Sequence, residues 1–174
     1  SCIIIMALLK FNNIGIRAIA AAVPRNVVKT RSLTEYYSEE DIEKFIVATG
    51  VEERRFAGTD VCASDLCYQA ACQIFDETDI KREDIDALFF ISQSSDYKIP
   101  GTSGILQHKL GLSKDTIVYD VNMSCSGFIH GLLMAYNFLQ QPDIKNVMVM
   151  VGDTLSKMIS MQDKGTGKLL GDAG

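Results

Sequence analysis

The chain has 174 residues, of which 47% are apolar and 22% charged, and its net charge is −5. A chain of about 150 residues buries roughly 70% of its unfolded surface, so this length supports a substantial core. The scattered lysines and arginines form no basic stripe of the kind that follows a phosphate backbone, so we expect no nucleic-acid partner.

The amino-terminal stretch SCIIIMALLKF contains about eight apolar residues with no basic flank before them. It is too short to span a bilayer, which takes about 20 residues, and it lacks the charged start of a signal peptide. We therefore expect residues 1–13 to be a leader or a remnant of cloning, and we expect no membrane partner.

The order of apolar runs predicts the fold class. Four segments have the composition of β-strands, at 14–22, 87–92, 116–121 and 146–151. The last three are nearly continuous apolar runs, as expected for strands buried on both faces. Helices are expected between them, at 38–48, 60–76, 102–110 and 125–140. Because strands and helices alternate, the sequence predicts an α/β fold with a mostly parallel sheet.

The first helix has a clear start and a clear end. Ser38 with Asp41 three residues later predicts an N-cap, and Gly50 can adopt the positive φ of a helix end. The following stretch, residues 51–60 (VEERRFAGTD), carries four consecutive charged residues. We interpret it as a solvated connector with local ion pairs of little energetic value.

Three of the five cysteines, Cys62, Cys67 and Cys72, recur every five residues. A five-residue step on a helix turns about 500°, so these thiols point in different directions and cannot converge on a metal. We expect no metal site, and we interpret these cysteines as small apolar fillers typical of a reducing cytosol. Cys125 lies in a different setting.

The helix expected at 125–140 is apolar nearly all the way round when it is projected at 100° per residue. Such a helix is expected to be buried in the middle of a layered domain, with its amino terminus buried too. Gly127 and Gly131, four residues apart, leave a stripe where another backbone can approach closely.

Cys125 is expected at the amino terminus of that helix, directly after a strand that ends near Asp120. The positive end of the helix dipole favours a thiolate, and a nucleophile is often held on such a tight turn from strand to helix. Two hypotheses remain open from position alone: a nucleophile in acyl transfer, or a thiol that only packs in the core. A hydrolase elbow is a weaker third, because Met123 replaces the first glycine of its motif.

A nucleophilic cysteine usually needs a base, and the chain has only two histidines. His108 lies beside Lys109 near the end of a short expected helix, where a surface role is favoured. His130 is five residues after Cys125, about 500° around the helix, so it does not return to the thiol. Neither histidine is a convincing partner.

Five motifs, taken together and in order, closely resemble the amino-terminal half of β-ketoacyl-[acyl-carrier-protein] synthase III, a family of the thiolase-like superfamily. The motifs are TGVEERRF (49–56), IDALFFISQSSDYKIPGTSGILQHKLGL (85–112), YDVNMSCSGFIHGL (119–132), VMVMVGDTLSKM (147–158) and DKGTGKLLGDAG (163–174). The resemblance covers residues 14–174 but only about half of a family member.

The resemblance implies a thiolase-like fold with five layers, α-β-α-β-α, built from two similar halves. This chain is expected to supply one half, with a mixed, mostly parallel five-stranded sheet and a buried central helix. On this interpretation residues 14–174 form the amino-terminal domain, and the carboxy-terminal domain is absent from the chain.

The resemblance also implies a mechanism for the complete enzyme. Cys125 matches the family's nucleophile, which takes an acyl group from a short acyl-CoA primer. Malonyl-carrier protein then loses carbon dioxide, and its carbanion attacks the thioester. The backbone N–H of Cys125 resembles an oxyanion-hole donor, while the family's His and Asn belong to the missing half. No cofactor is implied beyond these substrates. The implied partners are acyl carrier protein, an acyl donor and a second copy of the chain in a homodimer. The implied location is the cytoplasm.

Substrate-binding residues follow only in part. In relatives that accept acetyl-CoA, a tryptophan and two arginines hold the nucleotide, and the matching positions are Lys44, Ala48 and Lys164. Since only Lys164 keeps an arginine's charge and no lysine stacks like an arginine, another donor is open. The resemblance places Ile99 across the dimer interface, although it could be just an apolar anchor, and Phe128 beside the acyl site, where core packing is the simpler role.

Two further function classes stay open beside the condensing enzyme. A relative could move an acyl group to a hydroxyl or an amine, or condense a non-fatty chain for a secondary metabolite. A degenerate, non-catalytic scaffold domain is the alternative that is not an enzyme. In each case we expect the 174-residue chain alone to be inactive and to expose an apolar face.

Overall fold

The computed structural model describes residues 8–174, so most of the expected leader, residues 1–7, lies outside the described residues. The helices are α1 (Glu39–Thr49), α2 (Ala63–Glu77), α3 (Thr102–Leu110) and α4 (Gly127–Phe138). The strands are β1 (Asn26–Lys29), β2 (Glu53–Phe56), β3 (Ala87–Ile91), β4 (Ile117–Val121), β5 (Val147–Val151), β6 (Asp153–Thr154) and β7 (Asp172–Ala173). The helices and the last three expected strands therefore lie where the sequence predicts them, within a few residues.

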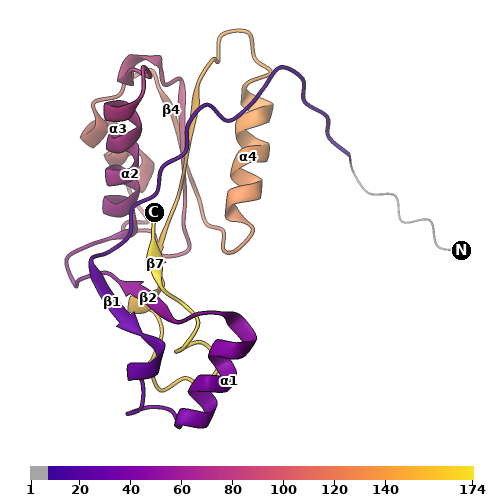
Figure 1. The fold of residues 1–174 in the computed structure, drawn as a ribbon. Coiled ribbons are helices and arrows are strands. Elements are labelled where there is room, and N and C mark those ends of the chain that lie inside the picture. Colours follow the sequence, from indigo (N-terminus) through magenta and orange to yellow (C-terminus); the bar gives the residue numbers. More distant parts are fainter. Residues whose placement is uncertain (1–7) are drawn as a thin grey trace, which may run out of the picture.

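A parallel sheet of order β4-β3-β5 forms the centre of the upper body (Figure 1). Leu88 and Phe90 of β3 face α2 and α3, whereas Ala87, Phe89 and Ile91 face α4. This alternation follows from the two-residue period of a strand and gives three layers, helix, sheet and helix. The α/β class and the parallel sheet predicted from the sequence are confirmed.

The edge strand β4 departs from the prediction that it is buried on both faces. Ile117 and Tyr119 are exposed, with 49% of Tyr119 accessible to solvent. β4 pairs only with β3, so one edge of the strand has no neighbouring strand among residues 8–174. The apolar run correctly predicted that residues 117–121 form a strand, but it did not reveal that this strand lies at the edge of the sheet.

A lower lobe extends below the sheet (Figure 1). It consists of the antiparallel pair β1–β2, helix α1 and the loop 158–171 that leads into β7. Its core comprises Leu33, Tyr37, Ile42 and Ile46, with Val28, Phe45 and Met161 packed against them. The interpretation of residues 51–60 as a solvated connector is wrong at Arg54, which is only 5% exposed. Alternation along β2 explains this, because every second side chain points into the lobe.

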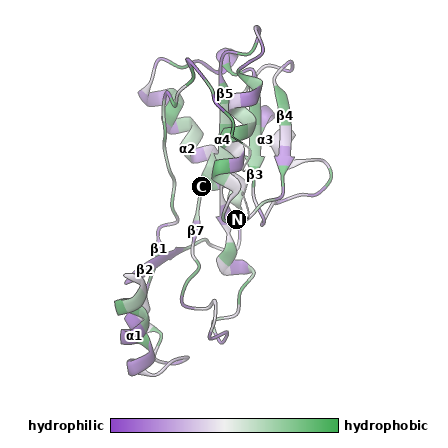
Figure 2. Cartoon of the chain, turned by 90° about the vertical axis from the view of Figure 1, so that its right-hand side faces the viewer, coloured by the Kyte–Doolittle hydropathy of each residue, from purple (hydrophilic) through white to green (hydrophobic). Residues whose placement is uncertain are grey.

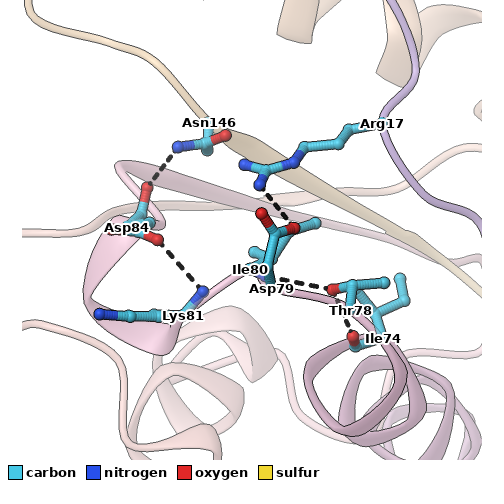
Figure 3. A network of polar contacts seen from close by, with 8 residues as sticks. All are labelled: Arg17, Ile74, Thr78, Asp79, Ile80, Lys81, Asp84 and Asn146. Carbon is cyan, nitrogen blue, oxygen red and sulfur yellow. Dashed lines mark hydrogen bonds and ion pairs between the residues drawn. The ribbon is translucent and has the colours of Figure 1, made fainter.

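Residues 14–22 form no strand, so the described sheet has three strands and not the expected five. Instead this segment is tied at its carboxyl end and at Arg17 within it. Ala22 exchanges two backbone hydrogen bonds with Gly174, at 2.7 and 2.9 Å. Arg17 Nη2 lies 2.8 Å from Asp79 Oδ1 on the connection between α2 and β3 (Figure 3). Residues 15–20 and β5 line a common cavity of about 200 Å³ together with residues of α4, and no backbone hydrogen bond joins the two segments.

The ends of α1 confirm the capping predicted from the sequence. Ser38 Oγ accepts a hydrogen bond from Asp41 N at 3.2 Å, and Gly50 ends the helix with a φ of 72°. Replacing Ser38 with alanine should lower the free energy of unfolding by about 1 kcal/mol, because one helix N–H loses its acceptor. Urea denaturation measures this. Ser38→Asp keeps an acceptor at this position and should be more stable than Ser38→Ala. Equal unfolding free energies of Ser38→Ala and Ser38→Asp would contradict the contribution of the cap.

Among residues 8–174, no helix is both long enough and apolar enough to cross a membrane.

Candidate active site

The carboxyl ends of the three parallel strands meet at one edge of the sheet, where α/β proteins commonly bind ligands. Beyond β4 the chain turns through residues 122–126 and enters α4 at Gly127. Cys125 therefore lies at the carboxyl edge of the sheet, two residues before α4 begins. The sequence placed the start of this helix at residue 125.

The thiol of Cys125 is exposed and lies in a tight turn. Gly127 N donates to Ser124 O at 2.7 Å across this turn, and Ser124 Oγ lies 3.4 Å from Cys125 Sγ. The prediction that this helix terminus is buried is wrong. Only one side of α4 rests on the sheet, and no described residue covers the other side at Cys125.

Two glycines hold the start of α4 against the sheet. Gly127 and Gly131 are both buried, and a Cβ at either position would collide with Ile91 at the end of β3. At Gly131 the added atom would also lie 2.7 Å from Val149 Cγ1. The close approach predicted from the glycine spacing is confirmed, but the neighbours are side chains of β3 and β5 and not another backbone.

The outer face of α4 is exposed, which contradicts the prediction of a helix buried on all sides. Only Gly127, Gly131 and Ala135 are buried, whereas Phe128 is 41% exposed and Ile129 65% exposed. Figure 2 shows hydrophobic (green) segments on α4, which faces the viewer there. An apolar helix is suited to packing on two sides; one side of α4 rests on the sheet, and among residues 8–174 its other side is only partly covered, with Phe11 in edge contact with Tyr136.

Two carboxylates, whose roles the sequence did not reveal, order the loops at the same edge. Asp153 Oδ1 accepts bonds from Ser92 Oγ, Gln93 N, Ser94 N and Ser94 Oγ, at 2.8–3.0 Å. Asp120 Oδ1 accepts from Ser103 N at 2.8 Å and so caps the start of α3. The only signal for them in the sequence is an acidic residue at the end of a predicted strand.

Neither histidine is hydrogen-bonded to Cys125 in the described part of the chain. His130 Nδ1 lies 3.0 Å from the carbonyl of Ser126, on its own helix, and His108 lies in the last turn of α3. The inference from helix geometry that His130 does not return to the thiol agrees with this contact.

The expected binding residues lie in separate segments. Phe128 is the second residue of α4 and follows Cys125 by three positions. Ile99 is 93% exposed in the loop between β3 and α3, and Lys164 is exposed in the loop 158–171 of the lower lobe. Lys44 is also exposed, on α1, and pairs with Glu40 at 2.7 Å. Phe128 is near Cys125 in the sequence, whereas Ile99 and Lys164 lie in other segments, and no hydrogen bond or ion pair among the described residues joins any of the three to the thiol.

The cysteines differ sharply in environment. Cys67 is buried in α2, and this burial, reinforced by the charges of Asp96 and Asp153, raises the pKa of its thiol to about 12. Cys62 precedes α2 and Cys72 lies within it, and both are half-buried. No cluster of three metal-binding side chains occurs anywhere in residues 8–174.

This contrast predicts selective alkylation. With iodoacetamide at pH 8, Cys125 should react much faster than Cys67, because Cys67 is both inaccessible and protonated. Peptide mapping by mass spectrometry over a time course measures both rates. Comparable rates in the folded protein would contradict the described burial of Cys67.

Comparisons with known proteins agree with this geometry. A family model described as 3-oxoacyl-[acyl-carrier-protein] synthase III matches residues 119–174, which include Cys125. The β-ketoacyl-[acyl-carrier-protein] synthase III of Fusobacterium nucleatum is 36% identical over 160 residues, which are 92% of this chain and 48% of the relative. That of Staphylococcus saprophyticus is 33% identical over 160 residues, 92% of this chain and 50% of the relative.

Solved structures share the fold. A 3-oxoacyl-(acyl-carrier protein) synthase of Burkholderia xenovorans matches with a TM-score of 0.85 and 34% identity, covering 90% of this chain and 46% of that one. OleA of Xanthomonas campestris matches with a TM-score of 0.76 and 26% identity, covering 96% and 57%. The chain spans about half the length of the curated relatives it matches. By sequence and by fold it belongs to the β-ketoacyl-[acyl-carrier-protein] synthase III family of thiolase-like proteins, as an amino-terminal fragment of that fold.

Proposed function

We propose that the complete protein containing this chain condenses an acyl primer with malonyl-[acyl-carrier-protein] through an acyl group carried on Cys125. One observation carries the proposal: an exposed thiol lies at the start of α4, on the carboxyl edge of a parallel sheet and within the segment that matches the family model. The reaction is a decarboxylative Claisen condensation, and it initiates fatty-acid synthesis.

In the first step the sulfur of Cys125 attacks the carbonyl carbon of the acyl donor. A new carbon–sulfur bond forms, the donor's own carbon–sulfur bond breaks, and the donor leaves as a thiol with the proton that Cys125 gives up. The start of α4 supports this step, because N–H groups and the positive end of a helix dipole stabilise the oxyanion that forms on the way.

In the second step malonyl-carrier protein loses carbon dioxide, and the resulting carbanion attacks the acyl carbon. A carbon–carbon bond forms and the sulfur of Cys125 is released. The groups that promote decarboxylation belong to the second half of the fold in this proposal. Phe128 lines the acyl chain, Ile99 reaches a second copy in a homodimer, and Lys164 binds the donor; all three side chains have exposed surface for these roles.

Intact-protein mass spectrometry of the full-length protein, incubated with acyl-CoA or acyl-carrier protein, tests the first step. The expected result is one added acyl group in the wild type and none in Cys125→Ala. Cys72→Ala is the matched control, since this half-buried thiol of α2 should leave acylation unchanged. A wild type that takes up no acyl group from either donor would rule the proposal out.

The second step has a separate readout. Addition of malonyl-carrier protein to the acylated enzyme should release carbon dioxide and yield a ketoacyl product in equal amounts. Acylation of Cys125 without either product would exclude condensation and leave simple acyl transfer to a hydroxyl or an amine.

A further inference from the structure

The loop 158–171 that carries Lys164 is held by residues from the other end of the chain. Tyr37, which precedes α1, and Arg54, in β2, both bind backbone carbonyl groups of this loop. These contacts join residues 113 to 126 positions apart. The family motifs gave no indication of them.

Arg54 is a buried cation with no carboxylate partner among the described residues. Its Nη1 donates to Gly167 O at 2.8 Å and to Leu170 O at 3.1 Å, and its guanidinium lies 5.0 Å from the centre of the Phe56 ring. Burial lowers the pKa of Arg54, but an arginine starts from a pKa so high that it stays charged. A charged donor makes stronger hydrogen bonds than a neutral one, so these two carbonyls are firmly held.

Tyr37 holds the loop at an earlier point, before the carbonyl groups that Arg54 binds. Its hydroxyl shares a single proton between Met161 O at 2.5 Å and Asp163 O at 2.9 Å. Burial, together with the nearby charge of Asp163, raises the pKa of Tyr37. The hydroxyl therefore stays protonated at neutral pH and remains a donor.

Gly167 lies against the Tyr37 contact, and its carbonyl is one of the two that Arg54 binds. A Cβ at this position would collide with the Tyr37 hydroxyl and would lie 2.8 Å from Asp163 O and 2.9 Å from Met161 O. Since two of these neighbours are backbone atoms, they cannot move aside cheaply. Only glycine lets the loop pass this close to Tyr37.

The short turn around Lys164 is closed as well. The side chain of Asp163, directly before it, accepts bonds from Gly165 N at 2.9 Å and from Thr166 Oγ at 2.5 Å. The carbonyl of Asp163 is bound by Tyr37. The backbone on both sides of Lys164 is thus fixed, while its side chain is exposed.

We propose that Tyr37, Arg54 and Gly167 form a clamp that positions Lys164 to bind a phosphate group of the acyl donor. This inference rests on the proposed function, and it assigns the three residues as positioning residues that touch no substrate. A lysine on a fixed backbone contributes more to donor binding than one on a mobile loop, because the backbone loses less conformational freedom when the donor arrives.

The test measures the rate of Cys125 acylation against donor concentration in the full-length protein, first with acyl-CoA and then with acyl-carrier protein. Tyr37→Phe and Arg54→Lys should each raise the KM for the donor about tenfold and leave the maximal rate within about twofold, because binding and not chemistry is affected. Arg55→Lys is the matched control: it alters the neighbouring arginine, whose side chain is 38% exposed.

A double-mutant cycle separates positioning from general stability. If the clamp acts through Lys164, Tyr37→Phe should have no further effect on KM in a Lys164→Ala background, whereas effects of independent residues add. Additive effects on KM would overturn the clamp. A Lys164→Ala variant with unchanged KM for both donors would overturn it too. In either case, acylation of Cys125 would still support the proposed function. A wild type that is never acylated would instead overturn the proposed function, and the clamp's role with it.

Hydrogen exchange gives an independent readout if a variant binds too weakly for kinetics. In Tyr37→Phe the amides of residues 161–170 should exchange faster, while those of β3 keep their wild-type protection. Unchanged exchange in the loop would contradict the clamp directly.

Discussion

Gly131→Ala is expected to destabilise the protein by about 1–3 kcal/mol, the usual cost of overpacking a core. The added methyl group would collide with Ile91 and lie 2.7 Å from Val149 Cγ1, and Ile91 is fully buried. Either these two buried side chains must repack or α4 must lift from the sheet. Because Cys125 lies at the start of that helix, its acylation should also slow.

Gly104→Ala is the matched control for this variant. Gly104 is also a helical glycine, in α3, but no described atom lies within 4 Å of the Cβ that alanine would add. Alanine is favoured over glycine within a helix, so Gly104→Ala should be neutral or stabilising by up to about 1 kcal/mol. Chemical denaturation compares the two. Equal unfolding free energies would mean that α4 does not rest on Ile91 as described.

Asp172→Ala is expected to cost about 3 kcal/mol or more, because it leaves buried donors without an acceptor, each worth about 1–3 kcal/mol. The buried carboxylate of Asp172 accepts bonds from Ala57 N at 2.6 Å, Ser156 N at 2.8 Å and Ser156 Oγ at 2.5 Å. It therefore joins β7 both to the end of β2 and to the chain after β6.

Two comparisons make the Asp172 experiment decisive. Asp115→Ala removes an exposed carboxylate and should change the free energy of unfolding by less than about 0.5 kcal/mol. Asp172→Asn keeps the shape but has one acceptor oxygen, so its stability should fall between that of the wild type and that of Asp172→Ala. A wild-type denaturation midpoint for Asp172→Ala would contradict the described network.

The elements that the sequence predicted best are those whose signals are local. Ser38 and Gly50 bound α1 because capping depends on residues only a few positions apart. The run at 87–92 predicted β3 because a central strand is apolar on both faces. Cys125 was identified at the start of α4 by the same kind of local signal, a change from strand to helix at a known residue.

The failures concern what covers an element, which no local pattern encodes. The apolar circumference of α4 predicted burial on all sides, but exposure depends on how many neighbours this chain supplies. Arg54 was interpreted as solvated because its sequence neighbours are charged, yet its partners, Gly167 and Leu170, lie more than a hundred residues away. Residues 14–22 have the composition of a strand, but composition does not specify pairing, and this segment forms no ladder with β5, whose outer edge has no other strand among residues 8–174.

The two parts of the structure differ in the chain separation of their contacts. The sheet and α4 come from one continuous stretch, residues 87–151, whereas the lower lobe joins residues 26–56 to the loop 158–171. Closing so long a loop costs entropy before any contact forms. The sheet and α4, which hold Cys125, should therefore form first in folding, and the lower lobe, which carries Lys164, should form last. Loss of the lobe by partial unfolding would then leave the nucleophile in place and remove only the surface assigned to the donor.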